Sequence, residues 1–188
     1  FGRCGRNGHQ DHGVYLASGS NLAIRNNVIR GNASRGIQLN TQGGQFGQLT
    51  GVTIERNLIT ANGHADYEDG IVLNATGTGT ISTVLIRNNV LAGNYYSGIR
   101  WVGDQYVDVQ VVKNTFFRNG VGSSASGRSE LNLDDVGSGA HSDVWGNLVV
   151  PAAKVLNGCY DAAPRGFSVH DNLVSGVLPT GACVSANT

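Results

Sequence analysis

The sequence predicts an all-β solenoid, in which short parallel strands stack along one axis around a continuous core. Two observations carry this prediction: an Asn-centred pattern recurs six times along the chain, and a Gly-led pattern follows it in most copies. The composition agrees, because 28 Gly and no Met among 188 residues leave few segments with good helix propensity. The length suits one domain with a substantial core, so we treat residues 1–188 as a single domain.

The first pattern reads apolar-x-apolar-x-x-Asn-x-apolar, and its Asn residues are 25 to 33 positions apart. Asn tolerates left-handed backbone at a bend, and its amide can bond the equivalent Asn one turn above and below. We therefore expect a ladder of Asn side chains at the bends. The six central residues are Asn27, Asn57, Asn89, Asn114, Asn147 and Asn172.

The second pattern reads Gly-apolar-x-apolar and begins at Gly13, Gly36, Gly70 and Gly98, with degenerate copies at Glu130, Gly158 and Gly181. A strand with one apolar face is not stable alone, but equivalent strands stacked at about 4.8 Å build parallel sheets. A β-sandwich is the rival fold, yet it has no reason to repeat one Asn-centred unit.

Stacking the Gly-led strands aligns charged residues of neighbouring turns. We expect these residues to form one exposed patch, in which Arg35 either bridges Asp11 and Asp69 as a surface ion pair or takes part in binding. The residues of the expected patch are Asp11, His12, Arg35, Glu68, Asp69 and Arg100.

Two other charged groups have simpler interpretations. Arg25, Glu55 and Arg87 occupy equivalent positions in three consecutive copies and alternate in sign, which predicts a ladder of salt bridges. The pair Asp134-Asp135 is predicted to form a turn.

The repeats over about residues 8–185 resemble the right-handed parallel β-helix superfamily, which includes pectate lyases, alginate and chondroitin lyases, and mannuronan epimerases. The resemblance implies a single-stranded right-handed parallel β-helix of about six to seven turns. Because solenoid ends need caps and no apolar capping helix is evident before residue 8, we expect the chain to be the C-terminal part of a longer β-helix. The segment 67–71 is similar to the strand that supplies calcium ligands in family-nine pectate lyases. It implies a Ca²⁺ site with Glu68, Asp69 and Asp66 as ligands, although Val72 replaces the third carboxylate of that motif.

The resemblance also implies a polysaccharide lyase-like protein that acts on or binds an acidic, uronate-containing polysaccharide, by β-elimination if it is catalytic. Such a reaction needs a base and a cation that neutralises the uronate carboxylate. The candidate catalytic residues are Arg100, His12 and Arg35, and the candidate substrate-binding residues are Tyr15, Gln38, Tyr96 and Trp101. The alternatives are a non-catalytic carbohydrate-binding or surface adhesion β-helix, or a fragment that lacks part of the active groove.

The balance of 13 basic and 13 acidic residues argues against a general nucleic-acid or anionic-membrane binder. No apolar run has the length of a membrane span, and we expect a monomer. A protein of this kind would be secreted, periplasmic or at the cell surface. A Cys159–Cys183 bridge would fit such a compartment and would leave Cys4 without a partner.

Overall fold

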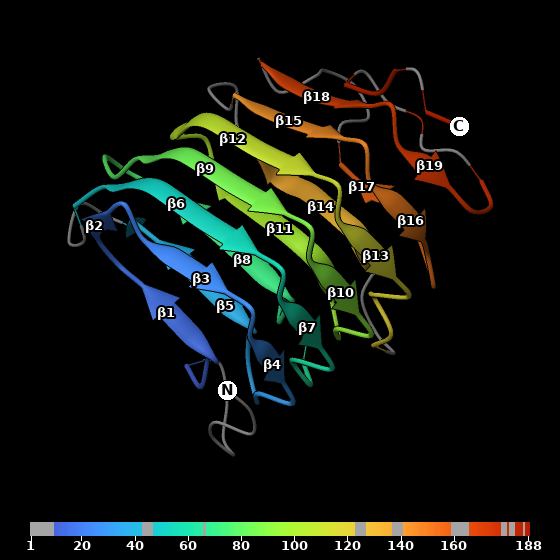
Figure 1. The fold of residues 1–188 in the computed structure, drawn as a ribbon, viewed down its shortest axis with the longest axis horizontal. Coiled ribbons are helices and arrows are strands. Elements are labelled where there is room, and N and C mark those ends of the chain that lie inside the picture. Colours follow the sequence, from blue (N-terminus) through green and yellow to red (C-terminus); the bar gives the residue numbers. More distant parts are fainter. Residues whose placement is uncertain are drawn as a thin grey trace.

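The computed structural model describes residues 10–42, 47–65, 67–122, 127–136, 141–158, 166–177, 180, 183–185 and 187–188. In these ranges the chain is a right-handed parallel β-helix, and its strands stack along one axis with β1 and β19 at opposite ends (Figure 1). This confirms the predicted fold class. Within the described ranges there is no helix of the length and apolar character needed to cross a membrane.

Each coil of the chain contributes to three parallel sheets in turn, and the described residues form six coils. The first sheet holds the Gly-led strands: β1 (Val14–Leu16), β5 (Ile37–Asn40), β8 (Ile71–Ala75), β11 (Ser97–Gly103), β14 (Ser129–Val136) and β17 (Leu156–Asn157). The second sheet consists of β2 (Gly19–Ser20), β3 (Ala23–Arg25), β6 (Leu49–Glu55), β9 (Ile81–Arg87), β12 (Tyr106–Val112), β15 (Ser142–Trp145) and β18 (Phe167–His170). The third sheet consists of β4 (Val28–Arg30), β7 (Leu58–Thr60), β10 (Val90–Ala92), β13 (Thr115–Phe117), β16 (Leu148–Val150) and β19 (Leu173–Val174).

Alternate residues of every sheet point into one apolar core that runs the length of the stack. Ile37 and Leu39 of β5, for example, are fully buried, and their partners in β8 are Ile71 and Leu73. The second and third sheets close the core from the other sides with Ile, Val, Leu and Phe side chains. Burial of each side chain of this size stabilises the fold by about 1.5–3 kcal/mol. A single coil could not bury its apolar face without the neighbouring coils.

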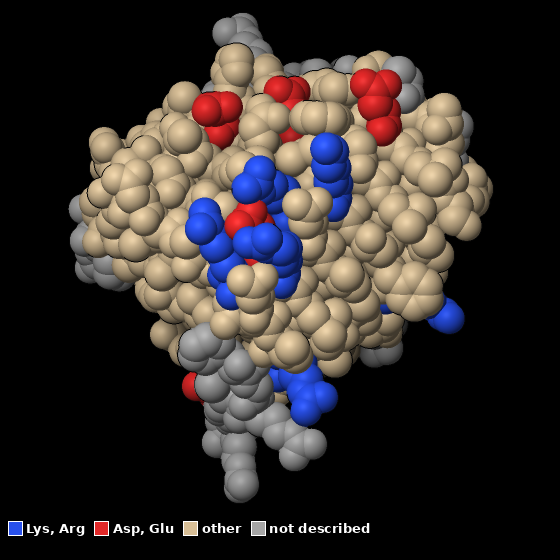
Figure 2. Space-filling view, in the orientation of Figure 1, with Lys and Arg blue, Asp and Glu red and all other residues tan. Residues whose placement is uncertain are grey.

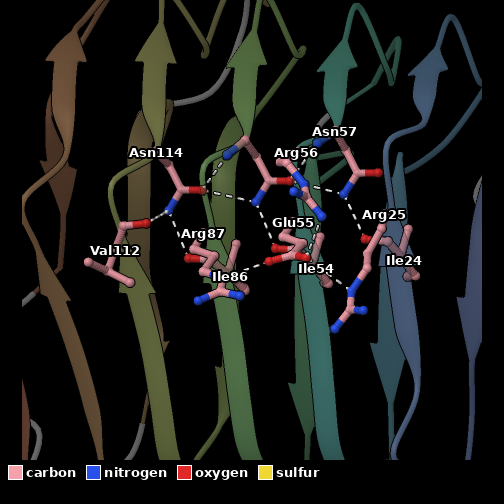
Figure 3. Close-up of polar contacts among 11 residues, drawn as sticks. Ile24, Arg25, Ile54, Glu55, Arg56, Asn57, Ile86, Arg87, Val112 and Asn114 are labelled. Carbon is pink, nitrogen blue, oxygen red and sulfur yellow. Dashed lines mark hydrogen bonds and ion pairs between the residues drawn. The ribbon is translucent and has the colours of Figure 1, made fainter.

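The predicted ladder of Asn side chains is confirmed at the corner between the second and third sheets (Figure 3). Asn57 Nδ2 donates to Asn89 Oδ1 at 3.0 Å, and Asn89 Nδ2 donates to Asn114 Oδ1 at 2.9 Å. The ladder continues to Asn187 beyond the last complete pattern. We expected the ladder Asn to adopt the left-handed conformation at each bend. The left-handed residue is instead the one before it, such as Arg56 with φ 55°.

A second ladder follows the third sheet and explains the glycines. Asn62 Nδ2 donates to Asn94 Oδ1 at 3.0 Å, deep inside the corner. A Cβ atom at Gly36 would lie 2.9 Å from Asn62 Nδ2 and 2.6 Å from the carbonyl oxygen of Gly70. Glycine is therefore required there by close approach of the next coil and not by its backbone angle.

Two predictions about the later coils were wrong. The first-sheet strand of the last coil is Leu156–Asn157, where Leu156 pairs with Leu131, so it ends before Gly158. Asp134 and Asp135 lie within β14 rather than in a turn, next to an irregularity at which Val102 pairs with Asp135. The side chains of these two acids lie outside the described residues.

Candidate functional site

The first sheet brings the predicted site residues into register. Gln38 of β5 pairs with Tyr15 of β1 on one side and with Val72 of β8 on the other, and Arg100 of β11 follows Val72. The position before each Gly is also aligned, because the N–H of Gly13 donates to Arg35 O and the N–H of Gly36 donates to Asp69 O. The columns expected from the repeats therefore exist.

The expectation of a single exposed patch is wrong, because three of its six residues, Glu68, Asp69 and Arg100, are buried. Glu68 and Asp69 have no exposed surface, and Arg100 is 7% exposed. The Arg100 guanidinium carbon lies 4.7 Å from the centre of the Tyr67 ring and 5.8 Å from that of Tyr96. These two tyrosines cover Arg100.

Asp69 is held among cationic and neutral groups of neighbouring coils. Its Oδ1 accepts a short hydrogen bond from the Ser97 hydroxyl, while its Oδ2 is buried with no hydrogen-bond partner in the described part of the chain. Burial raises the pKa of Asp69 to about 6, although the charges of Arg100 and Arg35 act in the opposite direction. Arg35 donates its hydrogen bond to Gln38, and its interaction with Asp69 is the attraction between their charges.

The surroundings of Glu68 and Asp69 fit protein donors better than a metal ion. Glu68 Oε2 accepts the N–H groups of His64 at 2.7 Å and Ala65 at 2.8 Å. No group of three or more His, Cys, Asp or Glu gathers among the described residues. Asp66, the third expected calcium ligand, lies outside those residues.

A polar pocket of about 380 Å³ opens on the outer side of the first sheet, next to this buried cluster. One chain of hydrogen bonds connects its walls: Arg35 Nη1 donates to Gln38 Oε1 at 3.0 Å, and Gln38 Nε2 donates to Asn40 Oδ1 at 3.3 Å. Asn40 Nδ2 then donates to the Tyr15 hydroxyl at 2.8 Å. The residues that line the pocket are Gln10, His12, Tyr15, Arg35, Gln38, Asn40, Gln42 and Asn74.

His12 and Arg35 give the pocket its electrostatic character. The His12 ring stacks on Tyr15 with a centroid distance of 5.6 Å, and its Nδ1 has no hydrogen-bond partner within the described ranges. Burial, reinforced by the positive charge of Arg35, lowers the pKa of His12 to about 4. Burial also lowers the pKa of Arg35, which remains a cation at neutral pH. The pocket thus places a neutral imidazole beside a guanidinium.

The other predicted substrate-binding residues divide into two groups. Tyr15 is 45% exposed and Gln38 lines the pocket. Trp101 instead lies in the core, where its ring meets Phe167 edge to face at 5.2 Å, so it has no surface to offer a ligand. Tyr96 is 3% exposed and packs against Tyr67.

Asn40 and Asn74 were missed as pocket residues. They are register partners two positions beyond Gln38 and Val72. Because side chains alternate along a strand, counting two residues further on the same face would have found them.

The chain contains one disulfide-bonded cysteine within the described residues, Cys183. Cys4 and Cys159 lie outside these residues, so the predicted Cys159–Cys183 pairing stays a prediction.

Comparison with protein families supports the fold. The family model described as "Right handed beta helix region" matches residues 3–81. No match was found among curated proteins or among solved structures. A β-helix region is typical of carbohydrate-active and surface proteins, whereas the pectate lyase-like subfamily stays a prediction. The matched region and the six stacked coils together identify the chain as a right-handed parallel β-helix.

Proposed function

We propose that the polar pocket on the first sheet binds a uronate unit of an acidic polysaccharide. The observation that carries this proposal is that Arg35 and His12 line one pocket together with amide and hydroxyl side chains. A guanidinium matches the planar geometry of a carboxylate, and amides of Gln and Asn can both donate to and accept from sugar hydroxyls. Gln38 and Asn40 already orient one another through hydrogen bonds.

The same two residues could support β-elimination. Arg35 would pair with the uronate carboxylate and stabilise the negative charge that develops on it. His12 would take the proton from the carbon next to that carboxylate. The released electron pair would form a carbon–carbon double bond while the bond to the leaving glycosidic oxygen breaks, and that oxygen would take a proton from Tyr15 or solvent. A bound carboxylate would raise the pKa of His12 and so make it a better base.

Arg100 is less suited to the role of base than the sequence suggested. It is buried against the rings of Tyr67 and Tyr96 and does not line the pocket. We assign it a positioning role, in which its charge acts on Asp69 and Arg35.

A non-catalytic carbohydrate-binding β-helix is the second candidate. The burial of Glu68, Asp69 and Arg100 favours it, because only Arg35 and His12 of the expected catalytic set line the pocket. In either case we place the function outside the cytoplasm, and the disulfide at Cys183 supports that proposal.

The test combines calorimetric binding of uronate oligomers with ultraviolet detection of the unsaturated product. Arg35→Gln should weaken binding by about tenfold or more, because a charge-assisted pair is lost. His12→Gln should retain binding and lose turnover by about 10²–10⁴-fold if the protein is a lyase. Arg30→Gln, which removes an exposed arginine of the third sheet, is the charge-matched control.

The outcomes separate the two candidates. Binding without product in the unaltered protein would select the carbohydrate-binding function. Equal binding by the unaltered protein and Arg35→Gln would refute the pocket as the uronate site.

A further inference from the structure

Glu55 on the second sheet forms ion pairs with three arginines from three consecutive coils (Figure 3). Its Oε1 lies 3.1 Å from Arg25 Nε and 3.0 Å from Arg56 Nη2, and its Oε2 lies 2.7 Å from Arg87 Nε. The predicted ladder of Arg25, Glu55 and Arg87 is thus confirmed, and Arg56 joins it. We call these four residues the arginine cluster.

The arginine cluster carries more positive charge than its carboxylate can neutralise. Three guanidinium groups share one carboxylate, which leaves an excess of two positive charges (3 − 1 = 2). The Glu55 side chain is only 6% exposed, whereas those of Arg25, Arg56 and Arg87 are 48%, 60% and 44% exposed. The carboxylate therefore lies beneath a surface of guanidinium groups. A ladder that served stability alone would not need the third cation, which adds repulsion.

Among the described residues, the surface next to the arginine cluster does not supply the missing negative charge. Figure 2 shows basic side chains gathered around a small acidic area over β3, β6 and β9, while the other acidic side chains visible on this face lie apart from it, toward its upper and lower edges. The chain as a whole has no net charge, so this excess is local.

We propose that the arginine cluster binds an oxyanion group, a carboxylate or a sulfate, carried on an acidic polysaccharide. Each guanidinium makes one contact with Glu55 and has further N–H donors in its planar fork. Such forks match the oxygen spacing of carboxylate and sulfate groups. Glu55 orients the three forks from below, and a ligand oxyanion would neutralise the excess charge from above.

Trp145 favours a saccharide over a small inorganic anion. Val112 pairs with Arg87 on one side and with Trp145 on the other, so the backbone of Trp145 lies two strand spacings, about 10 Å, from that of Arg87 in the same column. Trp145 is 37% exposed, and its Nε1 donates to Gln110 Oε1 at 3.2 Å. A ring held this way offers an apolar face to one sugar of a polysaccharide while a charged group of the same chain binds the arginine cluster.

This inference concerns a different sheet from the pocket of Arg35 and does not depend on it. Loss of binding in Arg35→Gln with an intact cluster response, or the reverse, would separate the two sites. The cluster could therefore act as a second contact for a long chain, or alone.

The first measurement is the thermal unfolding midpoint in sodium sulfate against sodium chloride at equal ionic strength. Sulfate should raise the midpoint of the unaltered protein more than that of Arg56→Gln, because the cluster lacks its excess charge in the variant. In low-salt chloride, Arg56→Gln should unfold at the same temperature as the unaltered protein or higher, since repulsion is relieved. Arg30→Gln should respond to sulfate as the unaltered protein does. An equal sulfate response in all three proteins would overturn the site.

The second measurement is calorimetric binding of a polyuronate and of a sulfated polysaccharide. The double variant Arg25→Gln/Arg56→Gln should lose about tenfold or more in affinity for at least one polymer. Trp145→Ala should weaken polymer binding but leave the sulfate response unchanged. A sulfate response without polymer binding, or tighter binding of single-stranded DNA than of either polysaccharide, would overturn the assignment to a polysaccharide.

Discussion

Glu130 ends the second ladder of asparagines, which contains Asn62 and Asn94. It accepts two hydrogen bonds from Asn119, one from the Asn119 N–H at 2.9 Å and one from the Asn119 side-chain amide. Every other step of that ladder joins two asparagines, as between Asn94 and Asn119 at 2.7 Å. Glu130 is fully buried, and burial raises its pKa to about 7 despite the hydrogen bonds from Asn119 and from the Ala152 N–H. An ionisable group therefore occupies the end of a neutral ladder.

The first prediction is that Glu130 makes stability depend on pH. A carboxyl group whose folded pKa exceeds its unfolded pKa favours folding below the unfolded value, near 4.5, and that contribution is lost as pH rises toward about 7. The unfolding free energy should fall over this range by up to about 3 kcal/mol from this group. Asp69, with its pKa raised to about 6, acts in the same direction. Urea unfolding at pH 5 and pH 8 measures the slope.

The matched variant is Glu130→Gln, which cannot ionise. It should flatten the pH dependence between about pH 5 and pH 7 while keeping the part due to Asp69. A slope identical to that of the unaltered protein would show that Glu130 does not titrate in this range.

The second prediction concerns Gly36, whose missing side chain allows two coils to approach. Gly36→Ala should lower the unfolding free energy by about 2–4 kcal/mol, because its Cβ would lie 2.6 Å from a backbone oxygen that cannot move without shifting the next coil. Gly47→Ala is the control, since its Cβ would meet only the Ser18 Cβ at 3.7 Å. Equal costs at the two positions would contradict the close-approach explanation.

The third prediction concerns Asn89 in the middle of the first ladder, between Asn57 and Asn114. Its side chain donates to Asn114 Oδ1 and to Ile54 O, both at 2.9 Å, and its Oδ1 accepts from Asn57. Asn89→Leu would leave buried donors and acceptors without partners on both sides, and should cost about 3 kcal/mol or more. Asn88→Gly, at the exposed left-handed position next to it, should change stability by less than about 1 kcal/mol. Denaturant unfolding of both variants makes the comparison.

The fourth prediction follows from the pKa of His12. If His12 is a base, turnover of a uronate polymer should be lost as pH falls through about 4 in the free protein, because the imidazole becomes protonated. Replacing Arg35 by Gln should move this loss of turnover to higher pH, since the charge of Arg35 contributes to lowering the pKa of His12. If the pH at which turnover is lost did not change in the variant, another group would control the pH dependence.

The repeats predicted the fold because both ladders depend on residues that recur. Asn57 and Asn89 stack only if their coils are in register, and the glycines mark where the next coil comes closest. The same logic placed Arg25, Glu55 and Arg87 side by side. Strand alignment is sufficient for such contacts because neighbouring coils are one strand spacing apart.

The candidate site was harder to predict because burial on the outer face is decided by loops, which do not repeat. Asp69 points out of the core by its position before Gly70, yet it is fully buried. Tyr67, outside the pattern, supplies a ring over Arg100. Trp101 was predicted as a candidate substrate-binding residue, but its place on the strand, two residues after Ile99, points it inward.

The last prediction concerns removal of the carboxylate beneath the arginine cluster. Hydrogen bonding from Arg87, together with the charges of Arg87, Arg56 and Arg25, lowers the pKa of Glu55, so its stabilising contribution is present above the unfolded pKa and is lost as pH falls through the lowered folded value. Glu55→Gln should therefore lower the unfolding midpoint at neutral pH and low salt, because three like charges remain together.

Two additions to Glu55→Gln should restore the midpoint if charge is the cause. Arg25→Gln in the same protein removes one of the repelling cations, and sulfate supplies an anion from solvent. Scanning calorimetry of the single variant, the double variant and the single variant in sulfate measures both effects. If neither addition raised the midpoint, the loss in Glu55→Gln would reflect packing around the buried side chain and not the charge of the carboxylate.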